Sequence, residues 1–384
     1  MKDRKLAATL RGASHGRHLT EDDALLLLRQ RGPAVADVLS AANEVRETRA
    51  GREVTYVVNK NVNWTNVCVN QCLFCGFSRP LGHPEAFCLS PRDVVLSVAE
   101  AAAKGVTEIC LTAGLHPEKH LRDYVSLVSL LHESFPALHI HGITPEELRH
   151  ALRGTGLTYR EGYRILRECG LGSVPGTAAE ILVDTVRAQV CPGKGSTQEW
   201  MEAVSAAQWE GLPTTATIMY GHVESIEDRV THMSLLRSLQ NERGAFTEFI
   251  PLPFIFPNTL LYETGMVKRS SSAVEDVLLM ATARLFLHNF TNLQASWVKY
   301  GERLAQLMLE CGANDLGGTL YGESISRSAG GRNRECLPVA ELRGLIEGMG
   351  RIPCQRTTLY ARLPDPKQQR AAGRRSALSG PAQE

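Results

Sequence analysis

The chain has 384 residues, of which 43% are hydrophobic and 22% are charged. Its 42 Lys and Arg against 41 Asp and Glu give a net charge of +1, which excludes a broad basic surface for nucleic acid or acidic membranes. No run approaches the ~20 apolar residues of a bilayer span, and the first residues lead into no apolar signal core. Ten cysteines without an export signal favour a reducing compartment, where clustered thiols bind metals. We therefore expect a cytoplasmic enzyme with no nucleic-acid or membrane partner.

The first fifty residues carry a helical pattern. Apolar residues recur at helical spacing between Leu25 and Leu39, so residues 1–50 are expected to form a helical extension. Beyond it, short apolar runs predict strands at 56–62, 108–112, 137–143, 172–174, 214–220, 247–252, 292–297 and 313–317. Helix-start signals lie between them, at Ser90 before a proline, at Thr144 before a proline, and at Thr158 three residues before a glutamate.

Strands that alternate with helices form right-handed βαβ units and a parallel sheet. Eight such strands predict a (βα)8 barrel of the TIM type, with a core over residues 51–290 that residues 291–363 complete or cap. The alternative is an open barrel of six strands with a separate C-terminal cap, because the last two strands have the weakest patterns. In either case the chemistry is expected where the strands end. Residues 364–384 contain few apolar side chains and are predicted to be a disordered tail.

Three cysteines follow the first predicted strand, at Cys68, Cys72 and Cys75. Their spacing lets three thiolates converge on one centre, and three ligands leave one iron of a [4Fe–4S] cube open to a small molecule. The alternative is a structural zinc site with a distant fourth cysteine. The seven remaining cysteines are scattered singly and make no second short pair.

This arrangement resembles the radical S-adenosyl-L-methionine (SAM) superfamily, whose signature is Cys-X3-Cys-X2-Cys with an aromatic residue before the last cysteine. The aromatic residue here is Phe74. The resemblance implies that Cys68, Cys72 and Cys75 are the metal ligands, that the methionine end of SAM chelates the open iron, and that Phe74 contacts the adenine. Reductive cleavage of SAM would then give methionine and a 5′-deoxyadenosyl radical.

The flanking segments resemble those of FO synthase subunit 2. They are residues 65–70, 172–182, 214–224, 249–254, 294–299, 312–319, 323–327 and 355–360, so the match extends over roughly residues 50–362. The resemblance implies transfer of the 4-hydroxybenzyl group of L-tyrosine to 5-amino-6-(D-ribitylamino)uracil, in coenzyme F420 biosynthesis. The products would include 2-iminoacetate, methionine and 5′-deoxyadenosine. FO synthase subunit 1 and a low-potential electron donor are the implied protein partners.

Four residues are candidates for binding SAM, in addition to Phe74. Glu180 follows the fourth strand, where the superfamily places an acid on the ribose hydroxyls. Arg187 lies one to two helical turns later and is predicted to meet the SAM carboxylate. Ala113 and Gly114 follow the second strand, where the family's backbone meets the SAM amino group. An alanine replaces the expected glycine there and removes some conformational freedom. The alternative for Glu180 and Arg187 is an ordinary surface position.

Tyr220, His222 and Glu224 alternate at the end of the fifth predicted strand, and on a continuing strand they would point to one side. We predict that this side is the barrel mouth and that His222 moves a proton during catalysis, with Tyr220 and Glu224 beside it. The alternative is a histidine that caps a turn through hydrogen bonds to the backbone.

Four further residues are predicted to bind substrate. Gln294 and Ser296 share a face of the seventh strand and are expected to read the uracil or ribityl groups. Asn314 and Asp315 are placed at the end of the eighth strand, at the same mouth, although Asp315 has the alternative of capping a helix.

Two rival functions remain. One is a radical SAM enzyme of menaquinone synthesis, aminofutalosine synthase or dehypoxanthine futalosine cyclase, or a diverged paralogue with another acceptor. The other is a non-catalytic iron–sulfur protein, which would yield no 5′-deoxyadenosine.

Overall fold

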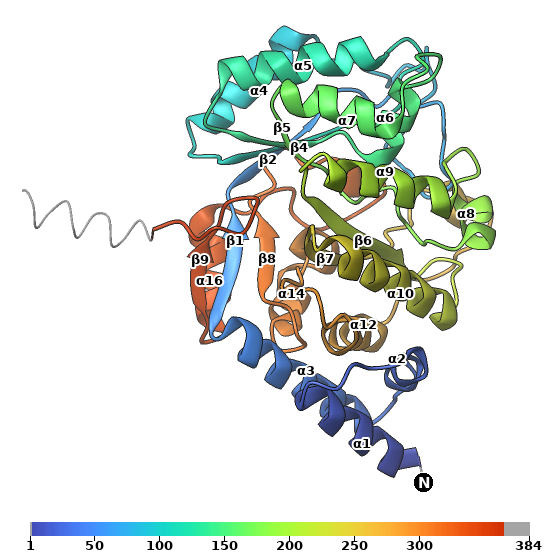
Figure 1. Cartoon of the computed structure of the whole chain (residues 1–384), viewed down its shortest axis with the longest axis vertical. Helices are drawn as coiled ribbons and strands as arrows, with labels where there is room; N and C mark the ends of the chain where they lie inside the picture. The colour runs from blue at the N-terminus through green and yellow to red at the C-terminus, as the bar shows by residue number, and fades with distance from the viewer. Residues whose placement is uncertain (1, 365–384) are drawn as a thin grey trace, which may run out of the picture.

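Three parallel sheets form the centre of the fold in the computed structural model, which describes residues 2–364 (Figure 1). Their strand orders are β8–β1–β9, β2–β3–β4–β5 and β6–β7. The strands are β1 (Glu53–Val57), β2 (Asn59–Asn63), β3 (Glu108–Thr112), β4 (His139–Gly142), β5 (Leu171–Ser173), β6 (Thr214–Tyr220), β7 (Phe246–Pro253), β8 (Asp315–Gly318) and β9 (Ile352–Gln355). All pairings between these strands are parallel, as the alternation of strands and helices predicts.

Single β-bridges connect the three sheets. They pair Val174 with Thr214, Phe249 with Leu293, Gln294 with Asp315, and Lys60 with Tyr321. The strands therefore follow one another around a barrel of the TIM type, although the continuous ladders among residues 2–364 stop short of closing it. The predicted seventh strand contributes only the bridges at Leu293 and Gln294, so the weak pattern there corresponds to a short stretch of pairing.

The helices cover the outside of the barrel, and several begin where the sequence predicts. Ser90, Thr144 and Thr158 each form a capping box at the start of α4 (Pro91–Ala102), α6 (Pro145–Ala151) and α7 (Tyr159–Glu168). The other helices after β2 are α5 (Leu121–Ser134), α8 (Asp184–Val190), α9 (Thr197–Trp209), α10 (Ile226–Arg243), α11 (Leu260–Glu263), α12 (Ala273–Phe286), α13 (Trp297–Tyr300), α14 (Glu302–Met308), α15 (Ile325–Ser328) and α16 (Val339–Gly348).

The N-terminal extension is helical, as predicted. Its helices are α1 (Lys2–Ser14), α2 (Glu21–Leu28) and α3 (Ala34–Ala50), which lie at the end of the molecule beside α12 (Figure 1). Contacts join α3 to α12 and α2 to both α10 and α12. Leu27 and Val38 are completely buried in this contact, so the extension shares the main hydrophobic core with the barrel.

The C-terminal strand β9 was not predicted. It pairs in parallel with β1, so the last strand lies beside the first. Just after it, the buried Arg356 guanidinium donates to Asp315 at the start of β8, with N–O distances of 2.5 and 3.2 Å. Arg356 also forms an ion pair of 3.5 Å with Glu248 near the start of β7. The segment after β9 therefore seals the amino-terminal end of the barrel.

No helix within residues 2–364 is both long and apolar enough to cross a membrane. Of the predicted disordered tail, residues 365–384 lie outside the described residues. The boundary between a core barrel and a C-terminal completion, placed at residues 290 and 291, stays a prediction.

Candidate active site

The three cysteines lie on a loop that follows β2, and all three line a cavity of about 440 Å³ inside the barrel. Backbone hydrogen bonds shape this loop, including those from the Cys68 N–H to the Arg79 carbonyl at 3.0 Å and from the Cys75 N–H to the Cys72 carbonyl at 2.9 Å. The Ser78 N–H also points at the Cys75 sulfur, 3.4 Å away. The loop therefore presents its sulfurs to the cavity with a backbone donor already beside one of them.

Gly114 holds the cysteine loop against the end of β3. Its N–H donates to the Thr65 carbonyl at 2.8 Å, and a Cβ on Gly114 would come within 2.4 Å of the Val67 carbonyl oxygen. Only glycine permits the backbones of residues 114 and 67 to approach this closely. Val67 directly precedes Cys68, so the contact fixes the start of the cysteine loop. Ala113 and Gly114 both line the cavity, where the SAM amino group was predicted to bind.

Glu180 and Phe74 also line the cavity, and Lys194 connects them. The Lys194 ammonium donates to the Glu180 carboxylate at 2.5 Å and lies 5.2 Å from the centre of the Phe74 ring. Burial opposes the charged form of Lys194, but Glu180 and the nearby cysteines raise its pKa well above the usual range. Glu180 has a backbone φ of +46°, a left-handed conformation that costs energy in a non-glycine residue. This acid is thus held at the cavity wall by both backbone and ion pair.

Arg187 lies elsewhere, and its predicted contact with the SAM carboxylate is not what the structure shows. Its buried guanidinium donates to the carbonyl oxygens of Gly195, Ala178 and Ala179 at 2.6 to 3.2 Å. It is absent from the lining of the cavity. Arg187 therefore holds the loop that carries Glu180, because it satisfies carbonyl groups that have no partner in a strand or helix.

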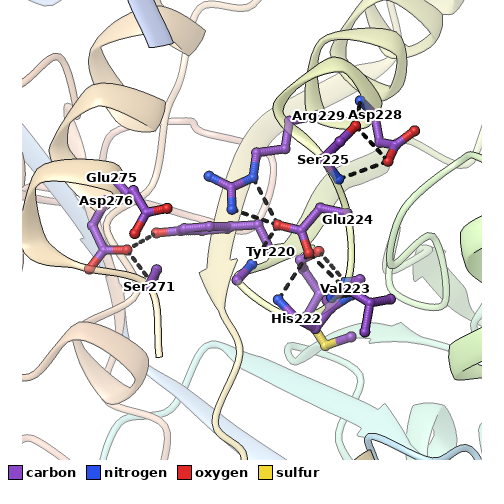
Figure 2. Close-up of polar contacts among 12 residues, drawn as sticks. Tyr220, His222, Val223, Glu224, Ser225, Asp228, Arg229, Ser271, Glu275 and Asp276 are labelled. Carbon is purple, nitrogen blue, oxygen red and sulfur yellow. Dashed lines mark hydrogen bonds and ion pairs between the residues drawn. The ribbon is translucent and has the colours of Figure 1, made fainter. Parts of the chain in front are cut away.

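The predicted catalytic residues Tyr220, His222 and Glu224 do not line the cavity either. On β6 it is Thr215, Thr217 and Met219 that face inward, so Tyr220 points outward to the helices. Its hydroxyl donates to the Asp276 carboxylate at 2.8 Å, and Figure 2 shows the ring directed toward α12 and away from His222.

His222 and Glu224 close a turn after β6 (Figure 2). The Glu224 carboxylate accepts hydrogen bonds from the Gly221 N–H at 2.6 Å and the His222 N–H at 2.9 Å, and it pairs with Arg229 at 2.7 Å. The His222 ring contacts the Met219 carbonyl through Nε2 at 3.1 Å, and burial lowers its pKa. The alternative of a turn-capping histidine is the one that the structure shows.

The four predicted substrate residues divide into two pairs. Gln294 and Ser296 line the cavity, with the Gln294 amide donating to Glu248 at 2.7 Å. Asn314 and Asp315 precede or begin β8 rather than end it, so they lie at the amino-terminal end of the barrel and away from the cavity. Asp315 pairs with Arg356, and the Asn314 amide oxygen accepts from Arg284 at 2.7 Å, so both placements at the mouth were wrong.

Sequence reasoning missed several polar residues that line the cavity. Asn59, Asn61 and Asn63 alternate along β2 and all face inward. This signal was readable, because polar residues at every second position of a barrel strand mark one face. The Asn61 amide oxygen is buried without a hydrogen-bond partner among the described residues. A polar ligand would satisfy it.

Besides Glu180, the charged residues that line the cavity are Glu108, Glu146, Glu147, Lys194, Glu248, Lys299, Glu323 and Arg356. Burial raises the pKa of Glu147 to about 7, and its Oε1 has no partner among residues 2–364. Burial also lowers the pKa of His141, another residue that lines the cavity, to about 4, so this histidine is neutral at physiological pH. Lys194 carried no pattern in the sequence, whereas Lys299 lies in the segment 294–299 that resembles the family but was not singled out as a site residue.

Two family models match the chain, and together they cover most of its barrel. They are the radical SAM superfamily over residues 62–236 and the CofH/MqnC C-terminal region over residues 243–369. A protein of Methanoculleus marisnigri named 5-amino-6-(D-ribitylamino)uracil–L-tyrosine 4-hydroxyphenyl transferase is 48% identical over 349 residues, which are 91% of this chain and 95% of that protein. The chain belongs to this family of radical SAM proteins. A relative of the same name from Archaeoglobus fulgidus is 46% identical, over 83% of this chain and 91% of its own.

Two solved structures share the fold of this chain. Methylornithine synthase has a TM-score of 0.72 at 18% identity, over 90% of this chain and 97% of its own. The FeFe-hydrogenase maturase HydG from Carboxydothermus hydrogenoformans also has a TM-score of 0.72, at 17% identity, over 93% of this chain and 81% of its own. At these identities the likeness shows the fold alone.

Radical SAM proteins use a [4Fe–4S] cluster and SAM, and the donor set here fits both. Three free cysteines reach one cavity, and burial raises the pKa of the Cys72 thiol well above its usual range. Binding to iron reverses this, because a coordinated thiol is held as the thiolate. No group of three His, Cys, Asp or Glu side chains within residues 2–364 is spaced for a single metal ion, whereas a cube takes one thiolate per iron.

Proposed function

We propose that this chain joins the 4-hydroxybenzyl group of L-tyrosine to C5 of 5-amino-6-(D-ribitylamino)uracil, in the formation of FO for coenzyme F420. The observation that carries the proposal is that a transferase named for these two substrates is 48% identical to this chain across 95% of its own length. Nearly the whole of that enzyme thus has a counterpart here. The cysteine loop and its cavity supply a site of the matching chemistry.

When bound, the cluster and SAM supply reductive cleavage of SAM to methionine and a 5′-deoxyadenosyl radical. The chain's own residues hold the reactants and exclude water. Apolar side chains such as Leu252, Phe254 and Leu320 line the cavity beside the cysteines, which keeps solvent from a reactive intermediate. Asn61, Thr215 and Thr217 offer hydrogen-bonding groups to a polyol or a uracil ring deeper in the barrel.

Glu147 is suited to hold or move a proton. Its Oε1 is buried without a well-formed hydrogen bond among the described residues, and its Oε2 accepts from the Thr144 N–H at 2.9 Å. The Ala113 backbone N–H also favours the charged carboxylate. Because burial raises its pKa to about 7, the carboxyl can gain or lose a proton at Oε1 near neutral pH. This is the role that sequence reasoning assigned to His222.

FO synthase subunit 1 and a low-potential electron donor are the partners that the proposal requires. The sequence contains one Cys-X3-Cys-X2-Cys motif, so ring closure of the product would fall to a second protein. The electron that cleaves SAM must come from an external reductant of low potential.

The test is anaerobic reconstitution with iron and sulfide, followed by mass analysis of products. With dithionite, SAM, L-tyrosine and 5-amino-6-(D-ribitylamino)uracil, we expect an adduct that carries the 4-hydroxybenzyl group, together with 2-iminoacetate or its hydrolysis product. Because one matching family model covers two kinds of C-terminal region, 6-amino-6-deoxyfutalosine is tested in parallel. Product from that compound alone would overturn the proposal, and so would an absence of 5′-deoxyadenosine from fully reconstituted enzyme.

A further inference from the structure

Lys299 differs from the other basic side chains that line the cavity. Lys194 is paired with Glu180, and Arg356 is paired with Asp315. The ammonium of Lys299 has no hydrogen-bond or ion-pair partner within the described part of the chain, yet Lys299 lines the same cavity as the cysteines. Lys299 is half-buried, and its ammonium has no counter-charge paired with it among residues 2–364, so it is suited to meet a negative group of a ligand in the cavity.

The backbone around Lys299 is fixed, so the free ammonium is not a consequence of a loose segment. Lys299 lies on α13, directly after the bridge residues Leu293 and Gln294. Asn333 donates to the carbonyls of Val298 and Lys299 at 3.0 and 3.2 Å. The neighbouring Trp297 is buried and donates from its indole N–H to the Gly318 carbonyl at 2.9 Å. The helix therefore holds Lys299 in place toward the cavity.

Glu323 provides the opposite charge on the same cavity. It is 7% exposed, and its Oε1 accepts from the Ser326 N–H at 2.9 Å and from the Ser326 hydroxyl at 3.1 Å. Its second oxygen, Oε2, is buried and has no partner among residues 2–364. One side of the carboxylate is thus anchored, and the other side is available to a donor.

Lys299 and Glu323 line the same cavity and interact electrostatically, but they do not form an ion pair. Burial lowers the pKa of Lys299, and the negative charges of Glu323, Cys75 and Glu180 act against that shift. Lys299 is therefore within electrostatic reach of Glu323 and of a cluster ligand. A molecule that carries both a carboxylate and an ammonium a short distance apart would satisfy both side chains at once.

We propose that Lys299 binds the α-carboxylate of the amino-acid substrate and that Glu323 accepts a hydrogen bond from its α-ammonium. The inference rests on the proposed function, which makes this substrate L-tyrosine. The pair would fix the tyrosine backbone on the cysteine side of the cavity and leave the phenol free to point elsewhere. SAM is the weaker candidate for Lys299, because its methionine end is expected to chelate the open iron.

The experiment compares L-tyrosine with two analogues on the reconstituted enzyme, by equilibrium dialysis with SAM present and without reductant. Tyramine keeps the ammonium and lacks the carboxylate, whereas 3-(4-hydroxyphenyl)propanoate keeps the carboxylate and lacks the ammonium. We expect Lys299→Met to raise the Kd of tyrosine and of the propanoate by about 10- to 100-fold, since a charged hydrogen bond to the carboxylate is lost. The Kd of tyramine should stay unchanged. Glu323→Gln should raise the Kd of tyrosine and of tyramine and leave the Kd of the propanoate unchanged.

Lys268→Met is the matched control, because Lys268 is exposed and does not line the cavity. It should bind all three ligands as the unaltered enzyme does, and Lys299→Arg should recover part of the carboxylate affinity. The visible absorption of the cluster reports that each variant is folded and loaded.

Equal losses for tyrosine and tyramine in Lys299→Met would overturn the inference, and so would unchanged tyrosine affinity with weakened SAM binding. The proposed function fails separately: an enzyme that shows the expected pattern of binding but makes no 4-hydroxybenzyl adduct binds the amino acid for another reaction. An unaltered enzyme that binds no tyrosine would overturn both.

Discussion

Lys194 donates to Glu180 at 2.5 Å on the wall of the cavity, with both side chains only 12% exposed. Both charges are largely removed from water, and the attraction between them offsets the free-energy cost of that removal. Because Lys194 also lies over Phe74, the pair connects the last turn of the cysteine loop to the residue predicted to bind the SAM ribose.

Removing Lys194 alone should therefore be more harmful than removing the pair. We expect Lys194→Met to lower the free energy of unfolding of the apoprotein by about 3–5 kcal/mol, because the Glu180 carboxylate remains buried without a partner. The double variant Lys194→Met with Glu180→Gln should regain a large part of that loss in urea denaturation. Additive losses in the double variant would show that the two residues act independently.

Cys72 is expected to be indispensable to the cluster, whereas Cys191 is not. Both are buried in the same small apolar group, so they form a matched pair of cysteines. Cys72→Ala should lose the visible iron–sulfur absorption and SAM cleavage and keep the far-ultraviolet circular dichroism of the fold. Cys191→Ala should keep all three. A colourless Cys191→Ala protein would support the alternative of a four-cysteine metal site.

Tyr220 and Glu224 are expected to act on stability and not on chemistry. Tyr220→Phe removes the buried hydrogen bond to Asp276 and the 3.2 Å contact with the Tyr300 hydroxyl. Asp276 keeps its bond from Ser271 at 2.6 Å, so the loss of stability should be about 1–2 kcal/mol. Glu224→Gln removes the charge beside Arg229 and should lower stability by about 3 kcal/mol.

Product formed per folded enzyme should stay the same in both of these variants, measured below their unfolding transitions. A fall of about 100-fold or more in kcat would instead be the mark of a general acid or base, and would return these residues to the reaction.

His232 should make the fold sensitive to acid. Its Nδ1 accepts from the Leu182 N–H at 3.0 Å and its Nε2 donates to the Thr217 carbonyl at 3.0 Å, so the ring is neutral in the fold. Burial lowers its pKa from 6.5 to about 3. Between pH 6.5 and 3 the unfolded chain binds a proton at His232 that the folded chain does not bind. The contribution of neutral His232 to the unfolding free energy is therefore complete above pH 6.5 and is lost as the pH falls toward 3.

A His232→Gln variant should lose this dependence. The difference in unfolding free energy between the unaltered protein and the variant should fall on the order of 4 kcal/mol between pH 7 and pH 3.5. Parallel curves of stability against pH for the two proteins would show that His232 is not the titrating group.

Local signals in the sequence were sufficient for much of the fold. Capping boxes at Ser90, Thr144 and Thr158 depend on residues three apart, so the helix starts could be read directly. Strand β9 could not, because its partner β1 lies three hundred residues earlier and its own residues are half exposed. Such pairing is decided by the closed arrangement of the whole chain.

The sequence predicted the part of the site that a cofactor-binding motif marks. It missed the part that depends on which residues of a strand face the cavity. Cys68, Cys72 and Cys75 reach one cavity as predicted, but Tyr220 points outward because the inward set of β6 begins at Thr215. A shift of one residue exchanges the two faces of a strand. The predicted position of Asp315 was wrong for a related reason, because Asp315 begins β8 and does not end it.

Arg356 closes the base of the barrel through Asp315 and Glu248, which come from β8 and β7. During synthesis on the ribosome, every strand that surrounds the cavity emerges before this plug does. Until Arg356 is in place, the buried carboxylates of Asp315 and Glu248 have no guanidinium between them, so the base of the barrel is complete only when the segment after β9 docks.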